Sequence, residues 1–333
     1  MKRRDSPSRP SARSALDLAE CFHLASVLKA LEKSGILDSL EQPVSIRTLA
    51  ARHSMDGAVL EAALRFLSAR TDLVVERAGK FRVTGAADPD ARFLLDQYLG
   101  AYGRISAGFE RVMRDPTAAS SLVDRRRHAV AFSRVEPMGP NFVADFALQL
   151  GFNHLLDLGC GAGALLVNLA TRNTAFSGWG LDQNPWMCTA ARKRLSAAGL
   201  RRRVRILAGD ACRLESSVPG HVRKRVSVVC AASLANEFFA QDGKQAVEWL
   251  RELRRLFPGR TLLVADYYGA VRRGGAVGPP EIMLHNFVQA ASGQGVPPGS
   301  LAGWRKIYKA ARCKLVYVLE INRTPYFIHL LRL

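Results

Sequence analysis

The stretch that decides the fold is His154-Leu155-Leu156-Asp157-Leu158-Gly159-Cys160-Gly161-Ala162-Gly163. Its apolar first half predicts a short buried strand, and residues 164–170 predict a helix directly after the loop. Glycines at the alternate positions 159, 161 and 163 let the backbone turn sharply and approach a bound group, because no Cβ stands in the way. Free N–H groups and the dipole at a helix N-terminus favour a negative group. Strand, loop and helix together indicate a ligand site.

Two further strands continue this pattern. Residues 178–182 form a short apolar run that ends in Asp182, and residues 204–207 lead into Gly209-Asp210-Ala211. In a doubly wound sheet, the acid after the second strand is the one that holds a ribose. We expect later strands at 225–230, 261–265, 315–320 and 326–331. This alternation of strands and helices predicts an α/β fold with a mostly parallel sheet covered on both faces.

The first part of the chain predicts a separate, smaller domain. Helical spacing covers residues 21–33, 46–52 (with Ser45 as N-cap) and 57–70, and residues 72–77 and 80–84 flank a turn as a β-hairpin. Three helices and a hairpin make a winged helix. Its third helix is mostly apolar and lacks the polar residues that read DNA bases, so we expect an interface or core helix. Residues 93–109 and 141–150 also show helical spacing.

Composition limits the function classes. The chain has 333 residues, 48% of them hydrophobic, and no apolar run long enough to span a membrane. Six cysteines without a C-x-x-C pair are typical of a reduced, cytoplasmic protein. The basic start, Met1-Lys2-Arg3-Arg4, is followed by no apolar region, so we expect a disordered tail and no export signal. The net charge of +19 comes from dispersed clusters, which favours a solvated basic surface over a nucleic-acid groove.

Taken together, the motif Asp157-Leu158-Gly159-x-Gly161-x-Gly163, Asp182 and Gly209-Asp210-Ala211 resembles class I S-adenosylmethionine (SAM) methyltransferases. The resemblance implies that the three glycines hold the methionine tail of SAM, that Asp182 binds the ribose hydroxyls, and that Asp210 binds the adenine amino group. It implies SAM as the cofactor. The expected cofactor-binding residues are Asp157, Gly159, Gly161, Gly163, Asp182, Gln183, Asp210, Ala211 and Ser233.

A winged helix followed by a SAM domain is similar to a large family of small-molecule O-methyltransferases from plants and bacteria. The resemblance implies a Rossmann-like seven-stranded methyltransferase domain and a homodimer formed through the N-terminal domain. We expect a basic tail at 1–15, a winged-helix dimerisation domain at 16–88, linker and substrate-pocket helices at 89–150, and the SAM domain at 151–333. Expected substrate-binding residues are Phe132, Met138, Asn141, Asp266, Tyr267 and Tyr268. Helix packing explains the first three equally well.

The chain departs from this family at the catalytic base. The family carries a histidine in a Trp-His-Asp-Trp-like segment after the fourth strand, where this chain reads Leu234-Ala235-Asn236-Glu237-Phe238-Phe239. Asn236 or Ala235 takes the place of that histidine, and asparagine cannot act as a base. Glu237 is one substitute, and His285 is another, on a helix face shared with Glu281 and Gln289.

In a third interpretation the acceptor needs no strong base. We then expect methylation at a thioether sulfur or at an enolisable 2-oxo acid carbon, ahead of a hydroxyl oxygen. Glu237 would stabilise cationic charge and Asn236 would orient the substrate. No short metal-binding motif is present, so we expect no metal.

The sequence thus predicts a SAM-dependent methyltransferase that acts on a small metabolite in a natural-product pathway. Two alternatives belong to other classes. The +19 charge would suit an RNA methyltransferase, and the winged helix would suit a SAM-responsive regulator that binds DNA.

Overall fold

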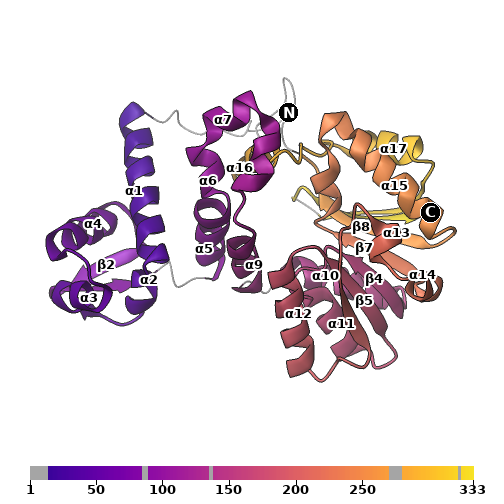
Figure 1. Ribbon diagram of the computed structural model, residues 1–333, viewed down its shortest axis with the longest axis horizontal. Helices are drawn as coiled ribbons and strands as arrows, with labels where there is room; N and C mark the ends of the chain where they lie inside the picture. The colour runs from indigo at the N-terminus through magenta and orange to yellow at the C-terminus, as the bar shows by residue number, and fades with distance from the viewer. Residues whose placement is uncertain (1–13, 85–88, 135–137, 270–279, 322–323) are drawn as a thin grey trace, which may run out of the picture. The chain divides into compact units, whose positions relative to one another are not determined.

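The computed structural model describes residues 14–84, 89–134, 138–269, 280–321 and 324–333. The chain forms two compact units, Met1–Gly103 and Arg104–Leu333, and we describe each by itself (Figure 1). The sequence suggests a last boundary at residue 150. In the structure, residues 104–149 fall in the unit that holds the large sheet.

The first unit has the helices and hairpin expected of a winged helix. Its three-stranded sheet has the order β1-β3-β2, with antiparallel pairing throughout. The elements are α1 (Ala15–Lys33), α2 (Ile36–Ser39), β1 (Val44–Ser45), α3 (Ile46–His53), α4 (Gly57–Arg70), β2 (Val74–Arg77), β3 (Lys80–Val83), α5 (Pro89–Leu94) and the π-helix η2 (Leu95–Ala101).

Local capping explains where two of these helices begin. Ser45 caps α3 as expected, because its hydroxyl accepts a hydrogen bond from the Thr48 backbone N–H. The first helix begins six residues before the expected Cys21, because Ser14 and Asp17 form a capping box. In that box the Ser14 hydroxyl accepts from Asp17 N at 3.1 Å, and the Asp17 carboxylate accepts from Ser14 N at 2.8 Å.

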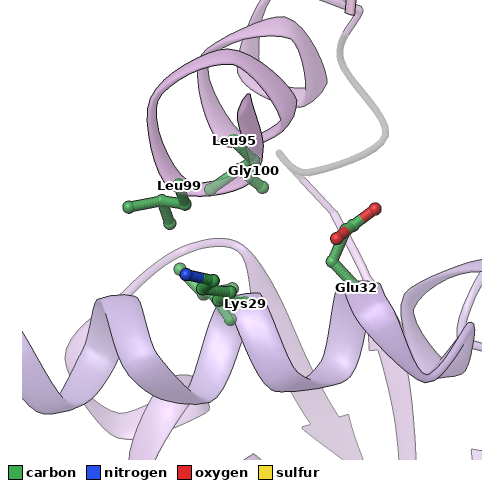
Figure 2. A pocket seen from close by; sticks show the side chains of 6 residues that line it. Lys29, Glu32, Leu95, Leu99 and Gly100 are labelled. Atoms are coloured by element: carbon green, nitrogen blue, oxygen red, sulfur yellow. The ribbon is translucent and has the colours of Figure 1, made fainter. Parts of the chain in front are cut away.

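Buried leucines hold the first unit together. Its core includes Leu49, Leu64 and Leu67, each 0% exposed. Helix α1 also meets η2 along a groove, which Leu28, Lys29 and Glu32 line from one side and Leu95, Leu99 and Gly100 from the other (Figure 2). This groove leaves no enclosed volume for a ligand, so we place no binding site there.

The helical spacing expected over 93–109 corresponds to several short helices rather than to one continuous helix. That segment runs through α5, η2, α6 (Gly103–Ala107) and the start of α7 (Phe109–Arg114). Glycines 100, 103 and 108 lie at or near the interruptions, and glycine weakens a helix interior by about 1 kcal/mol relative to alanine.

The second unit is built around one seven-stranded sheet. Its remaining helices are η3 (Pro116–Ala118), α8 (Ala119–Leu122), α9 (Arg125–Arg134), α10 (Met138–Gln149), α11 (Ala164–Arg172), α12 (Pro185–Ala197), α13 (Leu214–Ser217), α14 (Gly220–Arg225), η4 (Ala235–Phe238), η5 (Gln241–Gly243), α15 (Lys244–Leu256), α16 (Pro280–Ala291) and α17 (Leu301–Ala310). Its strands are β4 (His154–Leu158), β5 (Ser177–Asp182), β6 (Val204–Ala208), β7 (Val228–Ala232), β8 (Thr261–Tyr267), β9 (Lys314–Glu320) and β10 (Tyr326–Arg332).

The sheet order is β6-β5-β4-β7-β8-β10-β9. The first five strands pair in parallel, and β10 runs antiparallel to both β8 and β9. This confirms the predicted seven-stranded, mostly parallel sheet. The fourth of the expected strands begins three residues late, at Val228, because residues 220–225 form α14. Strand order reverses at β4, which is where such sheets bind ligands.

Helices cover both faces of this sheet (Figure 1). Residues of α10, α11 and α12 pack on one face with Leu155, Cys230 and Leu263. Residues of α15 and α17, including Trp249 and Trp304, pack on the other. These two cores hold the strands in place on both faces. The loops that follow β4, β5, β7 and β8 therefore begin at fixed positions along one edge of the sheet.

Candidate active site

The glycine loop after β4 has the backbone conformation that only glycine adopts freely. Gly159, Gly161 and Gly163 have φ values of +65°, +52° and +76°. A Cβ on Gly159 would lie 3.0 Å from Leu234 Cδ1, and one on Gly163 would lie 3.1 Å from Ala191 Cβ. A Cβ on Gly161 would meet nothing within 4 Å. The loop is therefore packed on two sides and open at its middle glycine, as a cradle for a bound group would be.

Asp182, at the end of β5, lies against this loop. Its Oδ2 accepts a hydrogen bond from Gly161 N at 2.9 Å, and its Oδ1 accepts from Asn184 N at 2.8 Å. Burial raises the pKa of Asp182, while these two backbone donors and the charge of Arg125 act in the opposite direction. The Asn184 side chain also donates to the Arg125 carbonyl at 2.9 Å, which fixes the start of α9 beside the loop.

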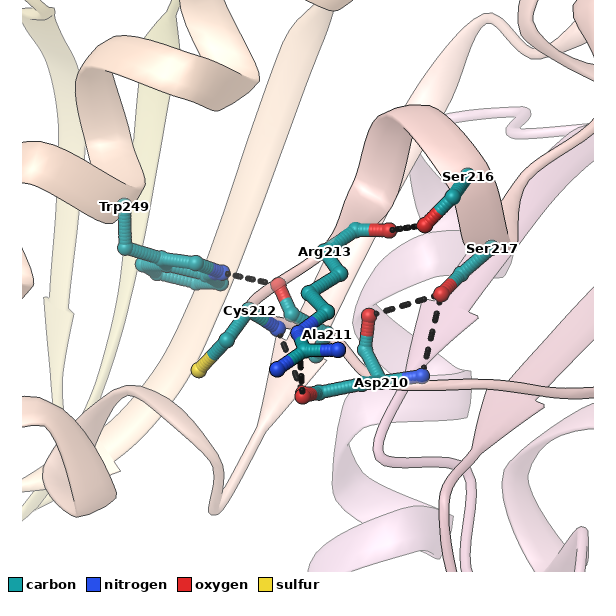
Figure 3. Close-up of polar contacts among 7 residues, drawn as sticks. All are labelled: Asp210, Ala211, Cys212, Arg213, Ser216, Ser217 and Trp249. Atoms are coloured by element: carbon teal, nitrogen blue, oxygen red, sulfur yellow. Dashed lines mark hydrogen bonds and ion pairs between the residues drawn. The ribbon is translucent and has the colours of Figure 1, made fainter.

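Asp210 is held at the end of β6 by its own turn (Figure 3). Its Oδ1 accepts from Cys212 N at 2.8 Å, and its backbone N–H donates to the Ser217 hydroxyl at 3.0 Å. The next residue is fixed as well, because Trp249 Nε1 donates to the Ala211 carbonyl at 3.0 Å. Asp210 and Ala211 thus form a rigid rim next to Asp182.

The remaining cofactor candidates differ in exposure. Asp157 is 3% exposed within β4, and burial, helped by the charge of Asp182, raises its pKa to about 8. Gln183 is exposed after β5. Ser233 is exposed after β7 with a φ of +53°, a left-handed conformation that is uncommon outside glycine.

Glu237 occupies the short helix η4 after β7. Its side chain is half-buried, and no hydrogen bond to its carboxylate is found within the described residues. Burial raises the pKa of Glu237 to about 7, the charge of Arg125 opposes this, and Asp182 adds to it. Glu237, Asp182 and Arg125 are therefore electrostatic neighbours at the carboxyl ends of the strands.

Two histidines complete this region. His285 on α16 packs edge-on against Tyr267, with ring centroids 5.3 Å apart, and burial lowers its pKa. On α9, the His128 ring packs at a tilt against Phe132, with ring centroids 4.7 Å apart. Burial, with smaller effects from Arg125 and His285, lowers the pKa of His128 to about 4. Both imidazoles are therefore neutral at pH 7.

Asn236, Asp266 and Tyr267 are buried, at 4%, 3% and 3% exposure. Asn236 donates to Asp266 through its backbone N–H at 3.0 Å and through Nδ2 at 3.1 Å. Its Oδ1 accepts from Gln289 Nε2 at 2.6 Å. From the sequence we expect these three residues to contact the substrate. In the structure their polar groups form hydrogen bonds with other residues of the protein.

The other expected substrate residues are dispersed. Half-buried Phe132 lies on α9 near the histidines, but exposed Asn141 accepts from Asn168 of α11. Tyr268 donates to Glu320 at 2.8 Å, on the side of β9 and β10. The Met138 and Glu281 side chains lie outside the described residues.

Sequence reasoning missed Arg125 and His128. Arg125 belongs to one of several arginine clusters, and the sequence gave no sign that this one begins a helix beside Asp182. His128 shows no chemical pattern in the sequence, where a surface or packing role suffices for it. Gln289 was noted only for sharing a helix face with His285. Only the fold brings these residues to the strand ends.

No group of three or more metal-ligating side chains occurs in the described part of the chain. All six cysteines are described, and no disulfide bond joins any two of them. Across the described residues, no helix is long and apolar enough to cross a membrane.

Comparisons with known proteins agree with this geometry. Residues 155–257 match the family model described as a methyltransferase domain. No curated protein sequence matches the chain. Among solved structures, the chain is similar to the mitomycin 7-O-methyltransferase MmcR, with a TM-score of 0.73, 18% identity and coverage of 95% of this chain and 96% of that one.

It is also similar to human N-acetylserotonin methyltransferase in complex with SAM, with a TM-score of 0.70, 18% identity and coverage of 97% and 99%. A third similar structure is the O-methyltransferase NcsB1 from neocarzinostatin biosynthesis, in complex with SAM and 2-hydroxy-5-methyl naphthoic acid, with a TM-score of 0.70, 16% identity and coverage of 97% and 99%. At these identities the likeness shows the fold alone.

The sheet, the glycine loop and the family match together define a class I methyltransferase domain. The protein is accordingly a SAM-dependent methyltransferase.

Proposed function

We propose that this enzyme methylates an acidic hydroxyl, phenolic or enolic, on a small metabolite, with Glu237 as the general base. The single observation that carries the proposal is the state of Glu237. Its carboxylate lies beside the charges of Asp182 and Arg125, has no hydrogen-bond partner within the described residues, and has a pKa raised to about 7. A base is most effective when its pKa lies near the working pH.

The glycine loop, Asp182 and Asp210 are the residues that would hold SAM. Space is free beside Gly161, where an added Cβ would meet no atom within 4 Å. Backbone N–H groups hold both carboxylate oxygens of Asp182 in place. These features suit a ligand that lies along the loop and the end of β5. When bound, SAM supplies a methyl group on a positively charged sulfur. The protein's own part is to orient the acceptor, to exclude water and to take the acceptor proton onto a Glu237 oxygen.

This proposal changes the order of acceptors expected from the sequence. A thioether needs no base, and a carboxyl group with a pKa near 7 is only partly ionised at neutral pH, so it would stabilise a product sulfonium poorly. Neutral His285 offers a further proton acceptor in the same region, whereas a pKa of about 4 makes His128 a weak base at neutral pH. The hydroxyl-directed names of MmcR and NcsB1 also favour an oxygen acceptor.

A substrate screen with methyl-labelled SAM tests the proposal. It compares phenols, enolic acids, thioether acids and amines, followed by pH–rate profiles of the best acceptor. We expect kcat/KM to rise with pH up to about pH 7 and then level off, because the ionised carboxylate is the active form. Glu237→Gln should lower kcat about 100-fold and abolish this rise.

Glu248→Gln, an exposed acid on α15, is the matched control and should keep the wild-type profile. Preferred methylation of a thioether, or an unchanged rising limb in Glu237→Gln, would contradict Glu237 as the base.

We also propose that the enzyme is a cytoplasmic homodimer assembled through the first unit. Supporting this, large apolar side chains are exposed along α1 and at the start of α4, among them Leu18 at 59%, Phe22 at 68% and Val59 at 70%. Clustered exposed apolar residues are typical of protein interfaces. The six cysteines form no disulfide bond, which supports a reducing compartment.

A further inference from the structure

Apart from the glycine loop, the second unit contains a ring of buried hydrogen bonds, formed by four polar side chains and closed by one backbone N–H. It joins three elements that are far apart in sequence: η4, the end of β8, and α16. Its members are Asn236, Asp266, Tyr267 and Gln289, each at most 4% exposed. A buried polar group costs stability unless it is hydrogen-bonded, so such a ring needs each member in place.

The ring has a direction. The Tyr267 hydroxyl donates to Gln289 Oε1 at 2.5 Å, and Gln289 Nε2 donates to Asn236 Oδ1 at 2.6 Å. Asn236 Nδ2 donates to Asp266 Oδ1, which also accepts from Tyr267 N at 2.9 Å and so closes the ring. Every donor points toward the carboxylate, and hydrogen bonds in such a chain strengthen one another.

The ring connects the two elements that carry the proposed proton acceptors. Glu237 follows Asn236 directly in η4, and His285 lies one turn before Gln289 in α16. Asn236 is fixed at its backbone by Asp266 Oδ2 and at its side-chain oxygen by Gln289. With both ends of Asn236 fixed, the direction in which the next residue leaves the helix is fixed as well.

We propose that Gln289 is a positioning residue for methyl transfer: through Asn236 it holds η4 so that the Glu237 carboxylate stays at the acceptor position. This inference rests on the proposed role of Glu237. It also gives Asn236 a function that suits its burial, since Asn236 holds the base in place and does not itself contact the substrate.

The test compares Gln289→Leu with Val288→Ala. Leucine has a similar size but cannot bond to Asn236 or Tyr267. Val288 is the adjacent buried residue of α16, 7% exposed, and its truncation disturbs packing without touching the ring. Glutamate-selective ¹³C labelling follows the titration of Glu237 by NMR, with Glu237→Gln identifying its signal.

In Gln289→Leu we expect the pKa of Glu237 to fall by about one unit, because a loosened η4 admits water to the carboxylate. We expect kcat to fall about tenfold, with little change in the KM for SAM, since misplacement affects the chemical step more than cofactor binding. Val288→Ala should change neither quantity, although it should lower thermal stability.

If Gln289→Leu does not fold, Tyr267→Phe serves as the second variant, because it removes only the first donor of the ring. We expect it to lower the pKa of Glu237 and kcat by less than Gln289→Leu would. A Glu237 titration that is identical in the ring variants and in Val288→Ala would overturn the positioning role. The titration needs no substrate, so this result is distinct from a screen that finds no hydroxyl acceptor, which would count against the proposed function.

Discussion

The environment of Asp157 opposes the ionisation of its carboxyl group. Asp157 lies in the central strand β4 at 3% exposure, where burial and the charge of Asp182 raise its pKa to about 8 from the ordinary 3.8. The proton therefore stays on Asp157 in the folded protein up to about pH 8, but leaves the unfolded chain above about pH 4. Between these values the folded state binds more protons, so stability must fall as pH rises.

We expect Asp157→Asn to remove this dependence, because asparagine is neutral at every pH. Between pH 5 and 7.5 the wild type should lose up to about 1.4 kcal/mol of unfolding free energy per pH unit relative to the variant. Urea unfolding at several pH values measures the difference. Wild-type and variant stabilities that run parallel across this range would show that Asp157 is ionised in the folded protein.

At the scale of elements, Arg203 joins the end of α11 to the start of β6. Its Nη2 donates to the Ala170 carbonyl at 2.5 Å, and its Nη1 donates to the carbonyls of Asn173, Thr174 and Phe176 at 2.9, 3.1 and 3.3 Å. The last carbonyls of a helix have no partner within the helix, and one guanidinium supplies several donors at once.

Arg203→Met should therefore destabilise the second unit by about 2 kcal/mol, since a charged donor is lost from several carbonyls. Arg202→Met is the control: Arg202 is exposed, and no side-chain hydrogen bond of its own is recorded among the described residues. Chemical denaturation of both variants checks this. Equal stabilities for the two would mean that water replaces the guanidinium without cost.

At the scale of the whole molecule, the proposed homodimer gives a direct prediction. Leu18 and Phe22 lie one turn apart on the exposed face of α1. Replacing both with glutamate places charge where the partner subunit would pack, so the dimer should dissociate. Light scattering should then give a monomer mass, against a dimer for the wild type.

His23→Glu, next to Phe22, is the matched control and should remain dimeric if the apolar residues carry the contact. A wild-type monomer at micromolar concentration would contradict the proposal.

The sequence by itself determined the doubly wound sheet, the glycine loop and the carboxylates after β5 and β6. These follow from local rules: apolar periodicity sets the strands, and positive φ at 159, 161 and 163 requires glycine. Where two local preferences compete, the ends of helices and strands differ from those expected from the sequence. A capping box extends α1, and α14 includes Arg225, the first residue assigned to the fourth strand of the large sheet.

Only the tertiary structure decided how the residues of the proposed catalytic site come together. Asn236 is polar in sequence, yet its partners Asp266 and Gln289 come from β8 and α16, so its burial and its structural role could not be read locally. The same holds for Arg125 and Glu237, whose charges meet only because α9 and η4 converge at the strand ends. Hydrogen bonding and burial depend on distances in space, and residues distant in sequence acquire those distances only when the sheet has formed.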